Sequence, residues 1–341
     1  MNNAFDIFVS PLSRRPLTVK NGFLITEDGS ERYEIRRGVP VLLPPDVQPE
    51  WNRELIEAIL WQYPDTVTQM YAEIKRCGRK CDPNLFYHKY IEKTLKDKQG
   101  IIDALEQYAR SDTEQWRVED NTSEKDFRRL SRWLTGRDRV KYVQRSSRTN
   151  HYPHYTSEVL KSNPKTILEL STGAGTGTAA ICKSKPSDCN VYTMDIDWVC
   201  HGNTVGIGKY LSCRDTLIPV TANFWWMPFA NGFFDTVCSH YGLDESRENT
   251  LTFAETARVL KNSGRFVVTS RKNSFMRQCG VLKKFGFTES ETVELMKKCR
   301  MYADTETMVE ECGKVGLMLE NQKEFQISEK HVAVVSVFVK K

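Results

Sequence analysis

The sequence predicts an α/β protein with a mostly parallel sheet, and three observations lead to that prediction. Residues 165–181 (KTILELSTGAGTGTAAI) combine a short apolar strand, a glycine-rich turn and the start of a helix. A second apolar strand, at 190–195, ends in an acidic residue. Strand-like runs then alternate with helical sequence, which is the pattern of a parallel sheet covered by helices.

The glycine-rich turn is predicted to bind a ligand, and Glu169 indicates its kind. Gly173 and Gly175 carry no Cβ, so backbone N–H groups and a helix N-terminus can approach a ligand closely. Glu169 lies near the end of the strand, and a buried carboxylate is costly unless a cation or donors meet it. S-adenosylmethionine brings an ammonium group and a sulfonium, whereas a dinucleotide brings a pyrophosphate that a carboxylate repels. The residues therefore favour S-adenosylmethionine.

Two other interpretations of this turn stay open at this point. Gly175, Gly177 and Ala180 satisfy the G-x-G-x-x-A pattern of dinucleotide sites, and Asp195 follows as an acid. A glycine-rich turn without a ligand is the third interpretation.

Length and composition indicate an ordinary globular protein of about two domains. The chain has 341 residues, 49 basic and 44 acidic, so its charge of +5 does not by itself imply nucleic acid. Ten cysteines without a signal peptide favour reduced thiols and a cytoplasmic location. Cys77 and Cys81 lack a second pair at metal-ligand spacing, so no metal is expected. No apolar run approaches the ~20 residues that cross a bilayer, so no membrane partner is expected.

Residues 1–46 are predicted to form a small β-rich domain. Strand-like runs at 17–20 and 22–26 precede a turn, and YEIRRGVPVLL follows at 33–43. This pattern resembles the zinc-ribbon activator subunit of tRNA methyltransferases. No cysteine lies in residues 1–46, so we expect packing in place of the metal. An unrelated β-element is the alternative.

Residues 47–150 are predicted to be a helical insertion or lid, because their apolar residues recur at helical spacing. Nine Lys and Arg residues lie within 125–148, among Phe127, Trp133 and Tyr142. An RNA-facing surface is one interpretation. The other, which we favour, is a solvated helix face with the aromatic rings packed beneath it. Residues 151–155 (HYPHY) are expected to be a short connector, because Pro153 disfavours a helix.

The sequence from 151 to 341 resembles the class I S-adenosylmethionine-dependent methyltransferases. Five elements match in order, namely ELSTGAG at 169–175, Asp195, NFWWMPF at 223–229, FDTV at 234–237 and RVLKNSGR at 258–265. The resemblance implies a Rossmann-like sheet of seven strands, with the last strand antiparallel to the others. It also implies a cofactor site of nine residues: Glu169, Ser171, Gly173, Gly175, Asp195, Ile196, Asn223, Phe224 and Ser239.

Within that resemblance, Glu169 positions the methionine ammonium and Asp195 holds the ribose diol. Ile196 packs on the adenine, Asn223 accepts from its amino group, and Phe224 offers a backbone N–H. Two departures from the family are Ser171, which replaces a glycine, and residues 262–263 (Asn-Ser), which replace proline-glycine. Neither removes a group that the cofactor needs.

The resemblance also points to the reacting centre and to the class of acceptor. His240 and Tyr241 follow the fourth strand, where donor and acceptor meet in the family, so His240 is our candidate base. A histidine that merely lines the pocket is the competing interpretation. We expect methylation of O or N on a small metabolite or modified peptide. An RNA base methyltransferase and a non-catalytic, cofactor-binding partner subunit are the alternatives. The acceptor and the oligomeric state do not follow from the sequence.

Overall fold

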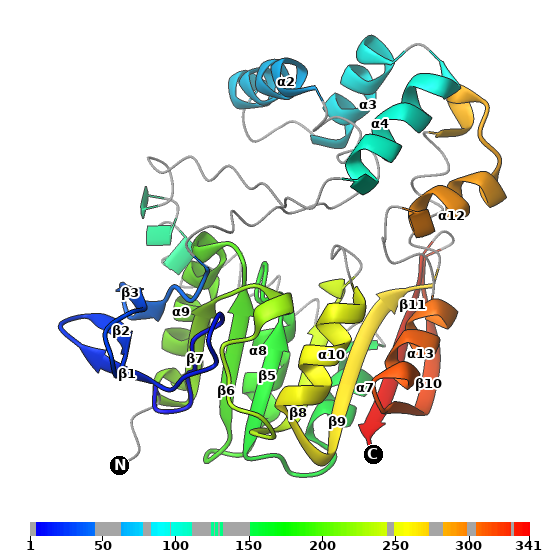
Figure 1. The fold of residues 1–341 in the computed structure, drawn as a ribbon. Helices are drawn as coiled ribbons and strands as arrows, with labels where there is room; N and C mark the ends of the chain where they lie inside the picture. The colour runs from blue at the N-terminus through cyan, green and yellow to red at the C-terminus, as the bar shows by residue number, and fades with distance from the viewer. Residues whose placement is uncertain are drawn as a thin grey trace.

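The computed structural model confirms an α/β fold around one seven-stranded sheet (Figure 1). It describes residues 5–44, 63–77, 83–95, 97–110, 124–125, 127–128, 130–131, 151–243, 249–272, 282–298, 305–328 and 331–341. The strand order is β10-β11-β9-β8-β5-β6-β7, and β5 to β9 run parallel. β11 is antiparallel to both β9 and β10, as the sequence predicted for the last strand.

The elements of the sheet alternate with helices along the chain. The strands are β5 (Thr166–Leu170), β6 (Asn190–Asp195), β7 (Leu217–Thr221), β8 (Phe234–His240), β9 (Leu260–Arg271), β10 (Leu317–Ser328) and β11 (His331–Lys340). The longer helices are α7 (His151–Leu160), α8 (Thr176–Ser184), α9 (His201–Tyr210), α10 (Asn249–Val259) and α13 (Thr305–Lys314). Short 3-10 turns η2 (Trp198–Cys200), η3 (Arg214–Thr216) and η4 (Phe224–Trp226) join them.

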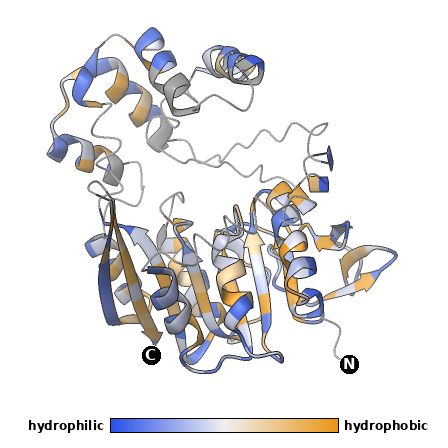
Figure 2. Cartoon of the chain, turned by 180° about the vertical axis from the view of Figure 1, so that it is seen from behind, coloured by the Kyte–Doolittle hydropathy of each residue, from blue (hydrophilic) through white to orange (hydrophobic). Residues whose placement is uncertain are grey.

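Two cores pack on the two faces of the sheet. On one face, Ile167 of β5 clusters with apolar residues of α7, α8 and α9. On the other, Leu168 and Leu170 cluster with residues of α10, α13 and the N-terminal segment. Because β5 is buried on both faces, its sequence is a continuous apolar run broken only by Glu169. Figure 2 shows hydrophobic residues concentrated in the strands and in the helix sides against them.

The segment expected to be a connector at 151–155 is instead the first part of helix α7 (His151–Leu160). Pro153 is the third residue of this helix. The first-turn N–H groups have no partner within a helix, so a proline there removes no hydrogen bond. The expectation failed because the position of Pro153 relative to the helix start was misjudged.

The N-terminal segment is a four-stranded antiparallel sheet: β1 (Leu17–Lys20), β2 (Phe23–Thr26), β3 (Arg32–Arg36) and β4 (Val39–Pro40). It shares a core with the large sheet, because Phe8 packs edge-on against Tyr192 of β6. Val41 pairs with Thr221 at the end of β7, and the Leu42 N–H donates to the Thr221 carbonyl at 2.8 Å. These contacts cover part of the β7 edge, which would otherwise expose unpaired backbone groups.

Two stretches that are distant in sequence form a helical cap. α2 (Pro64–Cys77) contacts α3 (Pro83–Thr94), and α4 (Lys98–Arg110) contacts α12 (Glu289–Lys298). The Lys98 ammonium lies 2.6 Å from a Glu291 carboxylate oxygen, and Lys284 bonds Glu92. In Figure 1 these helices lie beyond the end of the sheet toward which β9 points. Among the described residues, none of the helices combines the length and apolarity that a bilayer crossing requires.

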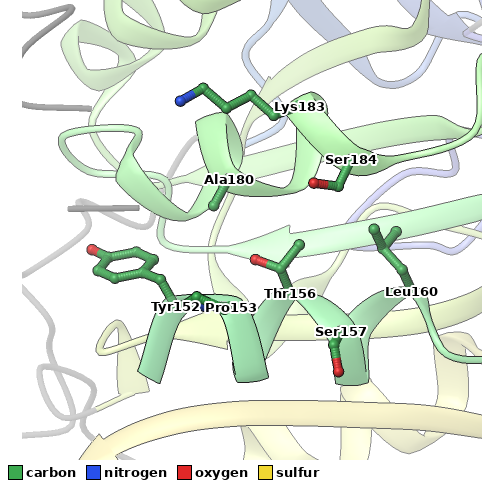
Figure 3. Close-up of a pocket in the computed structure, with 8 residues that line it drawn as sticks. All are labelled: Tyr152, Pro153, Thr156, Ser157, Leu160, Ala180, Lys183 and Ser184. Carbon is green, nitrogen blue, oxygen red and sulfur yellow. The ribbon is translucent and has the colours of Figure 1, made fainter. Parts of the chain in front are cut away.

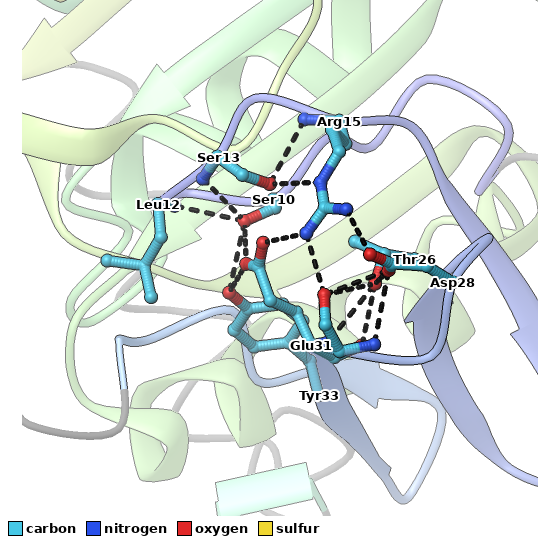
Figure 4. A network of polar contacts seen from close by, with 9 residues as sticks. Ser10, Leu12, Ser13, Arg15, Thr26, Asp28, Glu31 and Tyr33 are labelled. Atoms are coloured by element: carbon cyan, nitrogen blue, oxygen red, sulfur yellow. Dashed lines mark hydrogen bonds and ion pairs between the residues drawn. The ribbon is translucent and has the colours of Figure 1, made fainter.

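A polar network holds the loops of the N-terminal sheet (Figure 4). Arg15 donates to Ser30 at 2.7 Å and to Glu31 at 3.0 Å, and it pairs with Asp28. Glu31 also accepts from Ser10 and, at 2.8 Å, from the Tyr33 hydroxyl. Burial raises the pKa of Glu31, but hydrogen bonds from Ser10, Ser13, Tyr33 and Arg15 outweigh it and lower the pKa to about 2.

We expect Glu31→Gln to lower the thermal midpoint at pH 7 and to flatten its acid dependence. The Glu31 pKa is lower in the folded state than the unfolded value of about 4.3. Its contribution is therefore present above pH 4.3 and is lost as the pH falls toward 2. Melting curves between pH 7 and pH 2.5 test this. Glu34→Gln, at an exposed position of β3, is the control. Equal pH profiles for the two variants would contradict the network's role.

Candidate active site

The candidate site lies where the central parallel strands end. From β5 the chain proceeds outward to β6 and β7, and it then returns to β8 on the other side of β5. In open α/β sheets, ligands bind at the carboxyl ends of strands beside such a reversal. Glu169, Asp195, Ser239 and His240 belong to the ends of β5, β6 and β8, so the topology brings these predicted residues to one edge.

The glycine-rich turn after β5 has the backbone that a close ligand requires. Ser171, Gly173 and Gly175 have φ of 60°, 47° and 77°. A Cβ on Gly175 would lie 2.5 Å from Cδ1 of Ile207, whereas a Cβ on Gly173 would meet nothing within 4 Å. Gly175 therefore allows helix packing, and Gly173 leaves open space on the side of the turn. Asn203 of α9, which sequence reasoning missed, fixes the turn by donating to the Gly173 carbonyl at 2.8 Å.

Glu169 is buried beneath the start of α8. Its carboxylate accepts from the Thr178 hydroxyl, and a Cβ on Gly177 would lie 2.4 Å from its Oε1. Gly177, which we did not predict as a site residue, thus lets α8 approach the carboxylate. The pKa of Glu169 is raised to about 8, because burial and, to a smaller extent, the charge of Asp195 raise it more than the Thr178 hydrogen bond lowers it. A cationic ligand would reverse this rise.

Asp195 ends β6 and also shapes the glycine-rich turn. Its two carboxylate oxygens accept the N–H groups of Gly173 at 2.8 Å and Asp197 at 3.0 Å. A carboxylate oxygen can accept more than one hydrogen bond, as recognition of a diol requires. Ile196, the next residue, is partly exposed, as a residue that packs on a ligand ring must be.

The segment after β7 is held by its own cap and by a pair of arginines. The Asn223 side-chain oxygen accepts the Trp225 N–H at 2.8 Å and begins the turn η4 that holds Phe224. Arg14 and Arg258 both donate to the Met227 carbonyl at 2.8 Å, and both pair with Glu255. An amide oxygen has two lone pairs and can accept from two donors.

His240 lies in a cluster of aromatic rings at the end of β8. Its Nε2 is 3.2 Å from Nε2 of His151. The ring centroids of Tyr152, Tyr241 and Tyr155 lie 4.4, 4.5 and 5.4 Å from that of His240. Burial, then His151 and then Arg271 lower the pKa of His240 well below its usual range. His240 is therefore neutral at pH 7, as a general base must be.

Ser239 and Tyr241 flank His240 in different ways. The Ser239 hydroxyl donates to the Leu170 carbonyl at 3.3 Å, so it joins β8 to β5. Tyr241 has φ of 63°, and the Arg271 guanidinium lies 5.1 Å from its ring centroid. A pocket of about 330 Å³ lies between α7 and α8. Figure 3 shows Tyr152 at one end of it. Tyr152 therefore lies between this pocket and the ring of His240.

Sequence reasoning missed the contribution of α7, because it treated 151–155 as a connector. The helix brings His151, Tyr152 and Tyr155 onto His240. The available signal was the composition HYPHY, which places two tyrosines and two histidines ahead of the glycine-rich unit. Among the described residues, no group of three or more His, Cys, Asp or Glu side chains could hold a metal.

The described part of the basic stretch packs against α9. Phe127 stacks on Trp198 with ring centroids 4.3 Å apart. Its carbonyl lies so close to Gly202 that a Cβ there would be 2.7 Å away. Phe127 is buried, which agrees with the interpretation of aromatic rings packed beneath a solvated face. Trp133 and Tyr142 lie outside the described residues.

Residues 168–268 match a family model described as a methyltransferase domain. Similar solved structures include the N-methyltransferase NodS from Bradyrhizobium japonicum WM9 in complex with S-adenosyl-L-homocysteine, at 13% identity and a TM-score of 0.42, with 70% of this chain and 97% of that chain covered. Another is a geranyl diphosphate methyltransferase in complex with S-adenosylmethionine, at 11% identity and a TM-score of 0.42. The match covers 56% of this chain and 84% of that chain. No curated protein matches the sequence.

We expect binding of S-adenosylmethionine to weaken as the pH falls below 8. Glu169 is protonated below its pKa of about 8, whereas the ammonium of the ligand favours the ionised form. Binding therefore releases a proton, and the affinity should fall by up to about tenfold per pH unit below 8. Calorimetry at pH 6.5 to 8, in two buffers of different ionisation enthalpy, measures both effects.

Glu169→Gln should remove the proton release and weaken binding at pH 8. Asp188→Asn, at an exposed carboxylate before β6, is the control and should behave as the wild type. An unchanged pH slope in Glu169→Gln would contradict the role of this carboxylate.

Proposed function

We propose that this S-adenosylmethionine-dependent methyltransferase methylates O or N of a small metabolite or modified peptide. The observation that supports this acceptor class is the ring cluster around His240. His240 and the Glu169 carboxylate flank Gly177, because a Cβ there would lie 3.2 Å from the His240 Cβ and 2.4 Å from Glu169 Oε1. A neutral imidazole therefore lies one glycine away from the proposed ammonium site.

The chemistry needs alignment, exclusion of water and a place for the acceptor's proton. Methyl transfer from a sulfonium is an in-line displacement, and alignment supplies most of its acceleration. In our proposal His240 receives the proton and Tyr241 lines the acceptor side. We assign the cover that keeps water out to the helices α2, α3, α4 and α12.

The proposed cofactor site uses the nine residues assigned from the sequence. Glu169 meets the ammonium, Asp195 holds the ribose diol, and Ile196 packs on the adenine. Asn223 and the Phe224 N–H contact the adenine edge. Ser171, Gly173 and Gly175 form the backbone cradle, and Ser239 fixes the ends of β5 and β8. Asn203 and Gly177 join this set from the geometry.

The rest of our proposal concerns the other parts of the chain. We assign residues 1–46 to a zinc-ribbon-like domain that lacks metal ligands, 47–150 to a helical insertion or lid, and 151–341 to the methyltransferase domain. The exposed Arg15 side chain bonds Ser30, Glu31 and Asp28, so polar contacts hold these N-terminal loops together. The buried position of Phe127 favours a small acceptor over RNA. We place the protein in the cytoplasm.

A screen of amine, phenol and carboxylate acceptors that follows formation of S-adenosylhomocysteine tests the acceptor class. Turnover of a small O or N acceptor supports it. Methylation of RNA alone would replace it with the RNA alternative. Cofactor binding without any turnover would favour the non-catalytic subunit.

We expect Asp195→Ala to weaken binding of S-adenosylhomocysteine by about ten- to hundredfold. The substitution removes both ribose acceptors, at roughly 1–3 kcal/mol. Calorimetry measures the change, and a melting curve controls for loss of the Gly173 contact. Unchanged affinity in a folded variant would exclude Asp195 from the cofactor site.

His240→Ala should leave that affinity nearly unchanged and lower turnover by roughly 10²–10⁴-fold, because only the proton acceptor is lost. The two measurements separate cofactor binding from chemistry. Equal loss of cofactor affinity in Asp195→Ala and His240→Ala would place His240 in the cofactor pocket instead. Unchanged turnover would leave alignment alone as the mechanism.

A further inference from the structure

The imidazole rings of His151 and His240 are joined by a direct hydrogen bond. Their Nε2 atoms lie 3.2 Å apart, and the ring planes differ by 6° with centroids 5.4 Å apart. At this distance one nitrogen must carry the hydrogen and the other must accept it. The tautomer of one ring therefore determines that of the other. His151 is buried, so water does not readily replace this contact.

We propose that His151 is a positioning residue that fixes the tautomer of His240 and receives the proton that passes through it. This inference rests on the proposed methyl transfer. At rest, His240 carries its hydrogen on Nε2 and donates it to Nε2 of His151. Nδ1 of His240 then accepts the proton of the methyl acceptor as the methyl group leaves the sulfonium. The Nε2 hydrogen moves to His151, so the pair gains one proton and the cofactor leaves as the neutral thioether.

The groups around His240 explain why a single histidine would accept the proton poorly. His240 faces His151, Tyr152 and Tyr155 from α7, Tyr241 beside it, Arg271 at the end of β9, and Glu169 across Gly177. Burial and the nearby cationic group disfavour a charge on a single imidazole. When the proton is shared over two rings, the cost of accepting it falls, as in other pairs of base and orienting group.

Three variants of α7 separate this role from packing. His151→Phe keeps a ring and removes the nitrogen, and His151→Gln restores an acceptor near the position of Nε2. His154→Phe is the matched control, because His154 belongs to the same helix but faces Phe325, at a centroid distance of 5.3 Å. Melting curves and S-adenosylhomocysteine affinity should stay within about threefold of the wild type for all three, because none of these residues is in the proposed cofactor site.

The first readout is histidine ¹⁵N NMR of the full chain with S-adenosylhomocysteine, which needs no acceptor. We expect His240 in the Nε2–H tautomer in the wild type, His151→Gln and His154→Phe. We expect a mixture of tautomers in His151→Phe. An Nδ1–H tautomer in the wild type, or an unchanged spectrum in His151→Phe, would overturn the inference.

The second readout is turnover with an acceptor from the screen. His151→Phe should lower kcat by roughly 10–100-fold with KM within about twofold. His151→Gln should recover only the part of this loss that comes from the tautomer of His240, because an amide oxygen accepts a hydrogen bond but does not take up a proton. Recovery to the wild-type kcat in His151→Gln would overturn the transfer of the proton to His151. Equal kcat in His151→Phe and His154→Phe would overturn the relay. If no O or N acceptor is methylated while the tautomers behave as expected, the proposed function fails and not the assignment of the pair.

Discussion

The close approach of helix α8 to two strand ends is the constraint on which the site depends. Gly177 lies between Glu169 at the end of β5 and His240 at the end of β8, and its missing Cβ makes room for both. Any side chain at this position would push the helix away from the sheet or displace the carboxylate. The helix N-terminus, the acidic residue and the histidine are therefore parts of one arrangement, and their spacing is set by backbone packing.

The pKa values of Glu169 and His240, on the two sides of Gly177, are shifted in opposite directions. Burial raises the pKa of Glu169 and lowers the pKa of His240, so each group favours its neutral form when no ligand is present. A ligand with a fixed positive charge favours the ionised form of the Glu169 carboxylate, but it does not favour a positive charge on His240. Cofactor binding thus needs an ionised Glu169, whereas proton acceptance needs a neutral His240. The two neighbouring groups meet these requirements separately.

The sequence predicted the sheet and its strand ends well, because both are local patterns. The apolar runs before Glu169 and Asp195 located β5 and β6, and the family resemblance supplied the antiparallel last strand. The site was only partly predicted. Gly177 and Asn203 act through contacts across the fold, which no local pattern encodes. His151 was missed because a proline in a first turn and a proline that ends a helix look alike until the helix start is known.

The N-terminal sheet has a consequence for how the chain reaches this structure. Phe8 and Val41 are synthesised before their bridge partners, Phe229 and Thr221, which follow about 180 or more residues later in the chain. Until β7 is made, the apolar face containing Leu24 and Tyr33 has no sheet to cover it. These contacts join residues far apart in the sequence, and such long-range pairing makes folding slower. The N-terminal sheet thus leaves the ribosome before its partners and is among the last parts to be completed, and it needs protection from association with other chains in the interval.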